Sequence, residues 1–159
     1  MTQAPAPGPD ELALLIADVF DAAGVLRRYG ERTAATAGQT QARWQLLSVV
    51  SEGDWTVPMA ADRLGTSRQA VQRVANELVA DGLAAFEDNP RHRRSPRLRL
   101  NAEGRRVLGV ITREARRRHE LLGARLRALD PAALRAVLRQ LTAAVRAEIG
   151  DDDLPEGSA

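Results

Sequence analysis

The chain has 159 residues, and 44% of them are hydrophobic, which is enough for one domain with a sizeable core or one domain with an appended dimerisation region. The absence of cysteine excludes disulfides, thiolate metal sites and cysteine nucleophiles. The net charge is only +2, and all 23 basic residues are arginine. A GC-rich genome explains the missing lysine but leaves the clustering of arginine unexplained.

The N-terminal region contains one amphipathic helical pattern. Residues 1–9 are rich in proline and alanine and are expected to form a disordered lead. Asp10 is expected to cap a helix that Gly30 ends, with a loop before residue 40. Apolar side chains recur at intervals of three and four, namely at Leu12, Leu15, Ile16, Val19, Phe20, Ala23 and Leu26. This spacing predicts a helix with one apolar face.

Three shorter helical patterns follow, each beginning at a residue suited to N-capping. The expected caps are Thr40, Thr56 and Ser67. The last two helices, over 57–64 and 68–80, have the residue pattern of a helix-turn-helix. The pattern consists of the small Ala61, the turn residue Gly65, and the branched Val71 and Val74. A small residue lets the helices cross closely, glycine accepts a positive φ, and branched residues fix the crossing.

With the branched residues facing inward, a polar face of the second helix must point outward. Arginine and glutamine suit the guanine and adenine edges of the major groove. The expected roles are base contacts for Gln69, Gln72 and Arg73, base or backbone contacts for Arg68 and Asn76, and phosphate contacts for Thr66 and Ser67. Taken alone, such a face is more often an ordinary solvated helix surface.

A hairpin directly after this helix favours DNA binding. The segments LAAFE and PRLRL read as strands, because Leu98 and Leu100 alternate with arginines. The loop segment RHRRSPRLR holds five arginines and no acid. A helix-turn-helix followed by such a hairpin is a winged helix, and a basic wing fits phosphates or the minor groove. The wing residues expected to contact DNA are Arg91, His92, Arg93 and Arg94, with Arg93 in the minor groove.

The C-terminal part predicts a long helix from about Ala102 to Leu129 and a final helix after the cap signal Asp130-Pro131. The final helix has apolar positions at Leu134, Val137, Leu138, Leu141, Val145 and Ile149. Three helices with aliphatic stripes lie outside a small winged-helix core, so we expect a second copy to cover them. The expected organisation is a lead at 1–9, dimerisation segments at 10–39 and 102–150, a winged helix at 40–101, and a disordered acidic tail at 151–159.

From about Asp10 to Ile149 the chain resembles transcriptional regulators of the MarR (multiple antibiotic resistance regulator) family. The matching segments are TQARWQLLSVV, WTVPMAADRLGTSRQAVQRVANELVADGL, DNPRHRRSPRLRLNAEGRRV and LDPAALRAVLRQLTAAV. One feature departs from the family, whose wing usually carries an aspartate just ahead of its arginine pair. Here His92 precedes Arg93 and Arg94, and Asp88 is the acid expected to substitute.

The resemblance implies a mainly α fold with a small β-hairpin wing, and a ligand-responsive repressor. No cofactor is expected, and a transition-metal site is improbable because the chain has only two histidines and no cysteine. The resemblance also implies a homodimer on double-stranded DNA, with recognition helices about 34 Å apart on a pseudo-palindrome. The implied effector is a small aromatic molecule between the dimerisation helices and the winged helix. The candidate pocket residues are Phe20, Tyr29 and Trp44, for which core packing is the alternative role.

Two other classes of function are compatible with parts of this sequence. The alternative is a winged-helix module that binds proteins or has an architectural role. An enzyme is disfavoured, because the chain has no cysteine, only two distant histidines and no phosphate-binding glycine loop.

No segment approaches the roughly 20 apolar residues that span a bilayer. The N-terminus also lacks the pattern of a secretory signal, so we expect a soluble, cytoplasmic protein.

Overall fold

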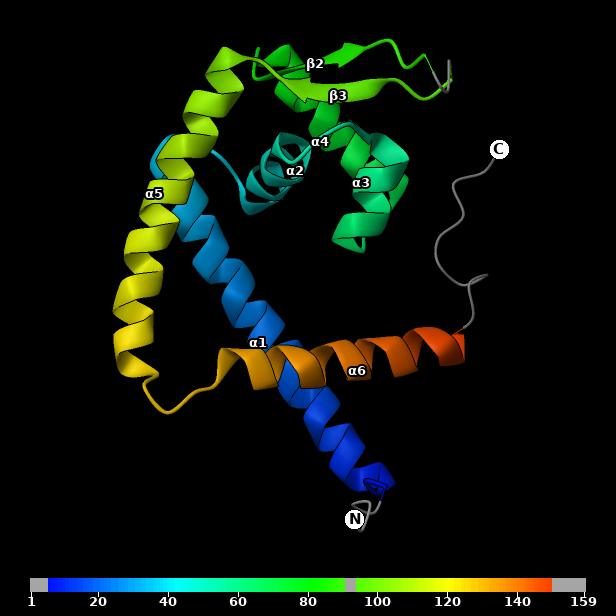
Figure 1. The fold of residues 1–159 in the computed structure, drawn as a ribbon, viewed down its shortest axis with the longest axis vertical. Helices are drawn as coiled ribbons and strands as arrows, with labels where there is room; N and C mark the ends of the chain where they lie inside the picture. The colour runs from blue at the N-terminus through cyan, green and yellow to red at the C-terminus, as the bar shows by residue number, and fades with distance from the viewer. Residues whose placement is uncertain (1–5, 91–93, 150–159) are drawn as a thin grey trace.

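The computed structural model describes residues 6–90 and 94–149. In chain order its elements are α1 (Pro9–Ala34), the 3-10 helix η1 (Ala35–Ala37), α2 (Gln41–Ser51), β1 (Trp55–Thr56), α3 (Val57–Leu64), α4 (Arg68–Ala80), β2 (Ala84–Glu87), β3 (Arg97–Leu100), α5 (Ala102–Arg125) and α6 (Pro131–Ile149). The mainly α fold with a small β wing is confirmed. In Figure 1, α2, α3, α4 and the strands gather at one end, and α5 and most of α1 extend away from them.

The helices α2, α3, α4 and α6 begin at the positions that their N-cap residues predict. The hydroxyls of Thr40, Thr56 and Ser67 each accept a hydrogen bond from the backbone N–H three residues further on, at 3.3, 3.5 and 3.1 Å. The carboxylate of Asp130 accepts from the N–H groups of Ala132 and Ala133 at 2.9 and 3.2 Å. Local hydrogen bonding therefore determines these four boundaries.

The ends of the two long helices differ from the sequence-based expectation. The N-cap of α1 is Gly8 rather than Asp10, and the Glu11 carboxylate accepts from the Gly8 N–H at 2.9 Å. α1 also continues past Gly30 to Ala34. Gly30 is buried, and a Cβ at this position would lie 3.0 Å from the side chain of Gln41. Gly30 therefore permits a close contact between α1 and α2 instead of ending the helix. α5 ends at Arg125, four residues before the expected end.

The strands form a three-stranded antiparallel sheet with the order β1-β3-β2. The β2–β3 hairpin and its alternation are confirmed, because Leu98 and Leu100 are buried and Arg99 is exposed. The strand β1 was not expected, and it pairs Trp55 with Leu98 and Thr56 with Arg97. It joins the edge of the wing directly to the start of α3.

The core lies within the winged helix and the first half of α5. Its largest fully buried aliphatic side chains are Leu46, Leu47, Leu78, Leu98 and Ile111. α5 approaches this core closely at Gly104, where an added Cβ would overlap the backbone carbonyl oxygen of Leu83. The side chain of Asn101, the N-cap of α5, also donates a hydrogen bond to the carbonyl of Gly82.

Outside this core, large apolar side chains lie exposed on the long helices. They are Leu14, Leu15, Ile16, Phe20, Val25 and Leu26 on α1, Leu121 and Leu122 on α5, Leu126 and Leu129 in the following turn, and Leu134, Val137, Leu138, Val145 and Ile149 on α6. We call this set the apolar arm surface. Among residues 6–90 and 94–149, none of the helices combines the length and apolar composition needed to cross a bilayer.

Candidate nucleic-acid interface

The helix-turn-helix has the geometry that its residue pattern predicts. α3 ends at Leu64, and Gly65 adopts a positive φ of 63°. The N–H of Thr66 then donates to the carbonyl of Ala61 at 3.1 Å, which closes the turn. Ala61 is only 1% exposed and Val71 only 3%, so both lie at the crossing of α3 and α4.

The opposite face of α4 carries the predicted DNA-contacting residues. Six of them are exposed and one, Ser67, is half-buried; the exposed residues are Thr66, Arg68, Gln69, Gln72, Arg73 and Asn76. The Nε2 of Gln72 donates to the Oδ1 of Asn76 at 2.9 Å. This bond holds two amide side chains together, one helical turn apart, on the surface expected to read bases.

The wing carries Arg94 as an exposed side chain near the start of β3. The other predicted wing residues, Arg91, His92 and Arg93, lie outside the described residues. At the base of the wing loop, the Nδ2 of the buried Asn89 donates to the carbonyl of Ser95 at 3.0 Å. Sequence reasoning missed Asn89, which read as an ordinary polar loop residue.

A carboxylate outside the wing pairs with the arginines of β3. The Oδ2 of Asp54 accepts from Arg97 at 2.8 Å, and its Oδ1 accepts from Arg99. Arg99 also lies 3.2 Å from a carboxylate oxygen of Glu87. Asp54 was not expected here, because it lies in a segment that reads as a helix break. The expectation that Asp88 substitutes for the missing wing acid stays a prediction, because Arg93 lies outside the described residues.

A cavity of about 320 Å³ separates the start of α4 from the wing. Three elements line it, with Val57 and Pro58 from α3, Arg68, Gln69 and Gln72 from α4, and Arg94, Ser95 and Pro96 from the wing. Among the residues that the structure describes, the lining contains two arginines and no carboxylate. It is therefore a place where a negatively charged group fits better than a cation.

The three candidate effector residues lie in different surroundings. Phe20 is 75% exposed on α1. Tyr29 is half-buried and stacks on His119 of α5, with 6.1 Å between the ring centroids, and its hydroxyl is buried with no hydrogen-bond partner among the described residues. Trp44 packs against the core and lines a groove of about 310 Å³ between α2 and the end of α3. A shared effector pocket stays a prediction.

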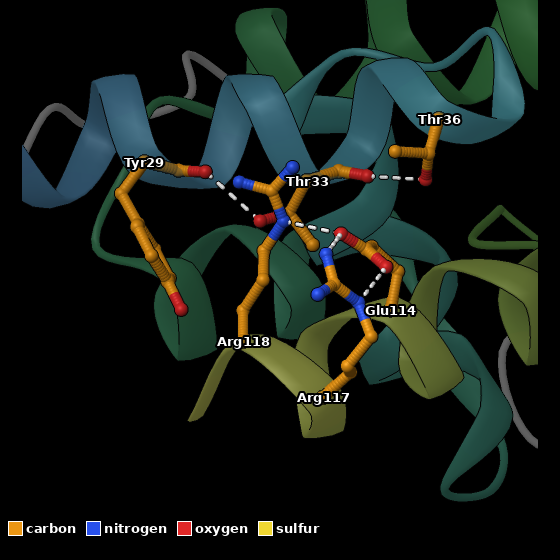
Figure 2. Close-up of polar contacts among 6 residues, drawn as sticks. All are labelled: Tyr29, Thr33, Thr36, Glu114, Arg117 and Arg118. Carbon is orange, nitrogen blue, oxygen red and sulfur yellow. Dashed lines mark hydrogen bonds and ion pairs between the residues drawn. The ribbon is translucent and has the colours of Figure 1, made fainter. Parts of the chain in front are cut away.

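Within α5, ion pairs one helical turn apart lie beside Tyr29 (Figure 2). The carboxylate of Glu114 accepts hydrogen bonds from Arg117 at 2.9 and 2.8 Å, and from Arg118 at 2.6 Å. These hydrogen bonds lower the pKa of Glu114 from 4.5 to about 2. On α1, the Thr33 hydroxyl donates to the carbonyl of Tyr29 at 2.9 Å.

Comparison with known proteins places the chain in a family. A family model described as the MarR family matches residues 37–95, which run from the end of η1 to the wing. The chain belongs to the MarR family. MarR-family proteins are DNA-binding transcriptional regulators, and the matched residues contain the helix-turn-helix and part of the wing.

This MarR-family chain has close relatives in mycobacteria. It is 57% identical over 143 residues to the uncharacterized proteins Rv2011c of Mycobacterium tuberculosis and Mb2034c of Mycobacterium bovis. The match covers 87% of this chain and 97% of each relative. The similarity therefore includes the long helices as well as the winged helix.

Solved structures of MarR-family and other transcriptional regulators have the same fold. The MarR/EmrR family regulator of Acinetobacter sp. ADP1 is 21% identical with a TM-score of 0.74, covering 87% of this chain and 98% of that one. MosR of M. tuberculosis in complex with DNA is 24% identical, with a TM-score of 0.71 and coverages of 83% and 96%. CouR of Rhodococcus jostii RHA1 bound to p-coumaroyl-CoA is 17% identical, with a TM-score of 0.67 and coverages of 83% and 90%.

Proposed function

We propose that this MarR-family regulator binds a pseudo-palindromic operator as a homodimer and represses transcription until a small aromatic effector releases it. The apolar arm surface is the observation that carries the proposal. Among the described residues, Met59 is the only exposed large hydrophobic side chain that lies elsewhere. An apolar surface confined to one end of the molecule marks an interface.

A second copy is the occupant that suits this surface best. Closed two-fold symmetry brings the same apolar helices of two chains together, so that each chain covers the apolar arm surface of the other. Burying each large aliphatic side chain contributes about 1.5–3 kcal/mol. The same symmetry presents two α4 helices to DNA, so that a pseudo-palindrome matches the dimer. The fold shared with MosR, whose structure contains DNA, supports the DNA-binding part of this proposal.

Selection of bound sequences from random double-stranded DNA tests dimer and base reading together. We expect enrichment of two inverted half-sites whose centres lie about 10 base pairs apart, one turn of the duplex. Light scattering on the same preparation should give the mass of two chains. An intact dimer that enriches no sequence would contradict the proposal and favour the protein-interaction alternative.

Arg73→Ala tests which residue reads bases. The exposed guanidinium is suited to a bidentate guanine contact, so its loss should weaken operator binding by about 1–3 kcal/mol and relax preference at one base position. Arg116→Ala, which removes an exposed arginine from α5, is the matched control. An equal loss on operator and unrelated DNA would make Arg73 a phosphate contact instead.

Effector release has its own test. The groove beside Trp44 offers an aromatic surface to a small ligand. The hydroxyl of Tyr29, which is not part of the lining of this groove, is a buried polar group with no hydrogen-bond partner among the described residues. We expect at least one of benzoate, 4-hydroxybenzoate and cinnamate to raise the melting temperature and release DNA in a gel shift. An unchanged melting temperature and gel shift with all three would argue against a small aromatic acid as the effector.

A further inference from the structure

We infer that the cavity between α4 and the wing holds one backbone phosphate of the bound DNA, contacted from two sides by Arg68 and Arg94. This inference rests on the proposed operator binding and goes beyond it, because it assigns two residues from different elements to the same phosphate. One phosphate would then set the positions of both the recognition helix and the wing.

The pairing of β1 with β3 places the two walls of the cavity opposite each other. Thr56 pairs with Arg97. The next residues of α3, Val57 and Pro58, therefore lie beside Pro96, which precedes Arg97. Proline fixes the backbone on both sides. Because this part of the lining is tied to one sheet, the gap between α3 and the wing is built into the fold.

Ion pairs at the base of the wing stabilise the pairing of β1 with β3, which positions the lining of the cavity. Asp54 immediately precedes β1 and contacts both Arg97 and Arg99 of β3. Neither carboxylate of this network, Asp54 or Glu87, lines the cavity. The acids of the wing base therefore hold the strands together, while the cavity itself keeps a cationic lining.

The chemistry of the lining matches a phosphodiester. Two guanidinium groups offer forked donors to phosphate oxygens, and the amides of Gln69 and Gln72 add neutral donors. A water molecule takes up about 30 Å³ of liquid, so about 320 Å³ leaves room for the phosphate, its ester oxygens and a few waters. A strand that crosses this point passes from the groove read by α4 to the groove beside the wing.

The experiment uses the full-length dimer and a set of operator duplexes. Each duplex carries one uncharged methylphosphonate in place of one phosphate. For the wild-type protein, we expect one position in each half-site where this change weakens binding roughly 10- to 100-fold, the range for hydrogen bonds to a charged group. At that same position, the methylphosphonate should weaken binding of the double variant Arg68→Ala/Arg94→Ala only about twofold or less, because neither guanidinium partner of the phosphate remains.

The single variants decide whether one phosphate is shared. Arg68→Ala and Arg94→Ala should each reduce the sensitivity at the same position, and their effects on operator binding should be coupled rather than additive. Arg116→Ala is the control, since α5 lies on the far side of the winged helix from the wing tip and α3 (Figure 1), and it should keep the wild-type profile. Circular dichroism melting of every variant establishes that it is folded.

Two results would overturn this inference without touching the proposed function. In one, Arg68→Ala and Arg94→Ala remove sensitivity at two different phosphates. In the other, a single phosphate stays equally important in the double variant. A wild-type protein that binds no operator at all is a distinct result, because it removes the proposed function itself.

Discussion

The winged helix and the long helices use the same kinds of side chain in opposite ways. In the winged helix, Leu47 and Leu78 have no measurable exposure. On α1, Leu14 is 70% exposed and Phe20 is 75% exposed. The winged helix therefore completes its core within one chain, whereas the arms gain most of their hydrophobic stabilisation only against another surface. A variant in each region should accordingly have a different signature.

The largest effect is expected from a charge in the apolar arm surface. Leu138→Asp places a carboxylate among the exposed apolar residues of α6 and should convert the proposed dimer to monomers. Losing the second half-site contact should weaken operator binding by about 10²–10⁴-fold. Light scattering and a gel shift measure the two effects. Gln140→Asp adds the same charge about 160° around the helix and should leave both unchanged. A dimeric Leu138→Asp variant with normal affinity would break the comparison.

A truncation within the winged-helix core should destabilise the chain independently of its partner. Leu78→Ala removes a fully buried side chain and should lower the free energy of unfolding by about 2–5 kcal/mol. Urea denaturation at several protein concentrations measures this change. The matched variant Leu14→Ala should act through the dimer, so that its effect varies with protein concentration. Concentration dependence in Leu78→Ala alone would reverse our assignment of the two regions.

The junction between the regions is probed at Gly104. Gly104→Ala should lower the free energy of unfolding by about 1–3 kcal/mol, because the new Cβ overlaps the carbonyl of Leu83. Gly109→Ala, in the same helix, meets only the end of the Arg113 side chain at 3.5 Å. It should instead stabilise the protein by roughly 0.5–1 kcal/mol. Thermal melts of both variants test the difference, and equal effects would show that the close approach at Gly104 is unimportant.

The smallest expected effect concerns pH. The pKa of Glu114 is lowered from 4.5 to about 2 in the folded protein, so its contribution to stability is present above about pH 4.5 and is lost as the pH falls toward 2. Glu114→Gln should remove this part of the pH dependence in thermal melts. Glu120→Gln removes another carboxylate from the same helix and serves as the control. The same pH dependence in wild type and Glu114→Gln would exclude this contribution.

Much of the winged helix could be predicted from the sequence because its signals are local. A cap such as Ser67 acts three residues away, and Gly65 needs only its own positive φ. The exposed face of α4 then follows from which residues are buried. The alternation of Leu98 and Leu100 likewise needs no distant partner. These features depend on residue type and short spacing, which a single sequence displays.

The features that sequence reasoning missed depend on distant partners. A glycine that ends a helix and a glycine that permits close packing look alike, and only the contact with Gln41 distinguishes the role of Gly30. The strand β1 has two residues, too few to show alternation. Asp54 finds its arginines 43 and 45 residues further along the chain. For the same reason, local patterns in the sequence do not show whether the three candidate effector residues lie close together.

The close approach of Gly104 to Leu83 gives α5 the mechanics of a lever. Because there is no free space between Gly104 and Leu83, we expect α5 to rotate together with the winged helix. α5 contains 24 residues and is about 36 Å long, so a rotation of about 5° about its far end moves the winged helix by about 3 Å. That displacement is close to the rise of about 3.4 Å between successive base pairs. We therefore expect a small rotation of the arms to shift each winged helix by about one base pair along the duplex.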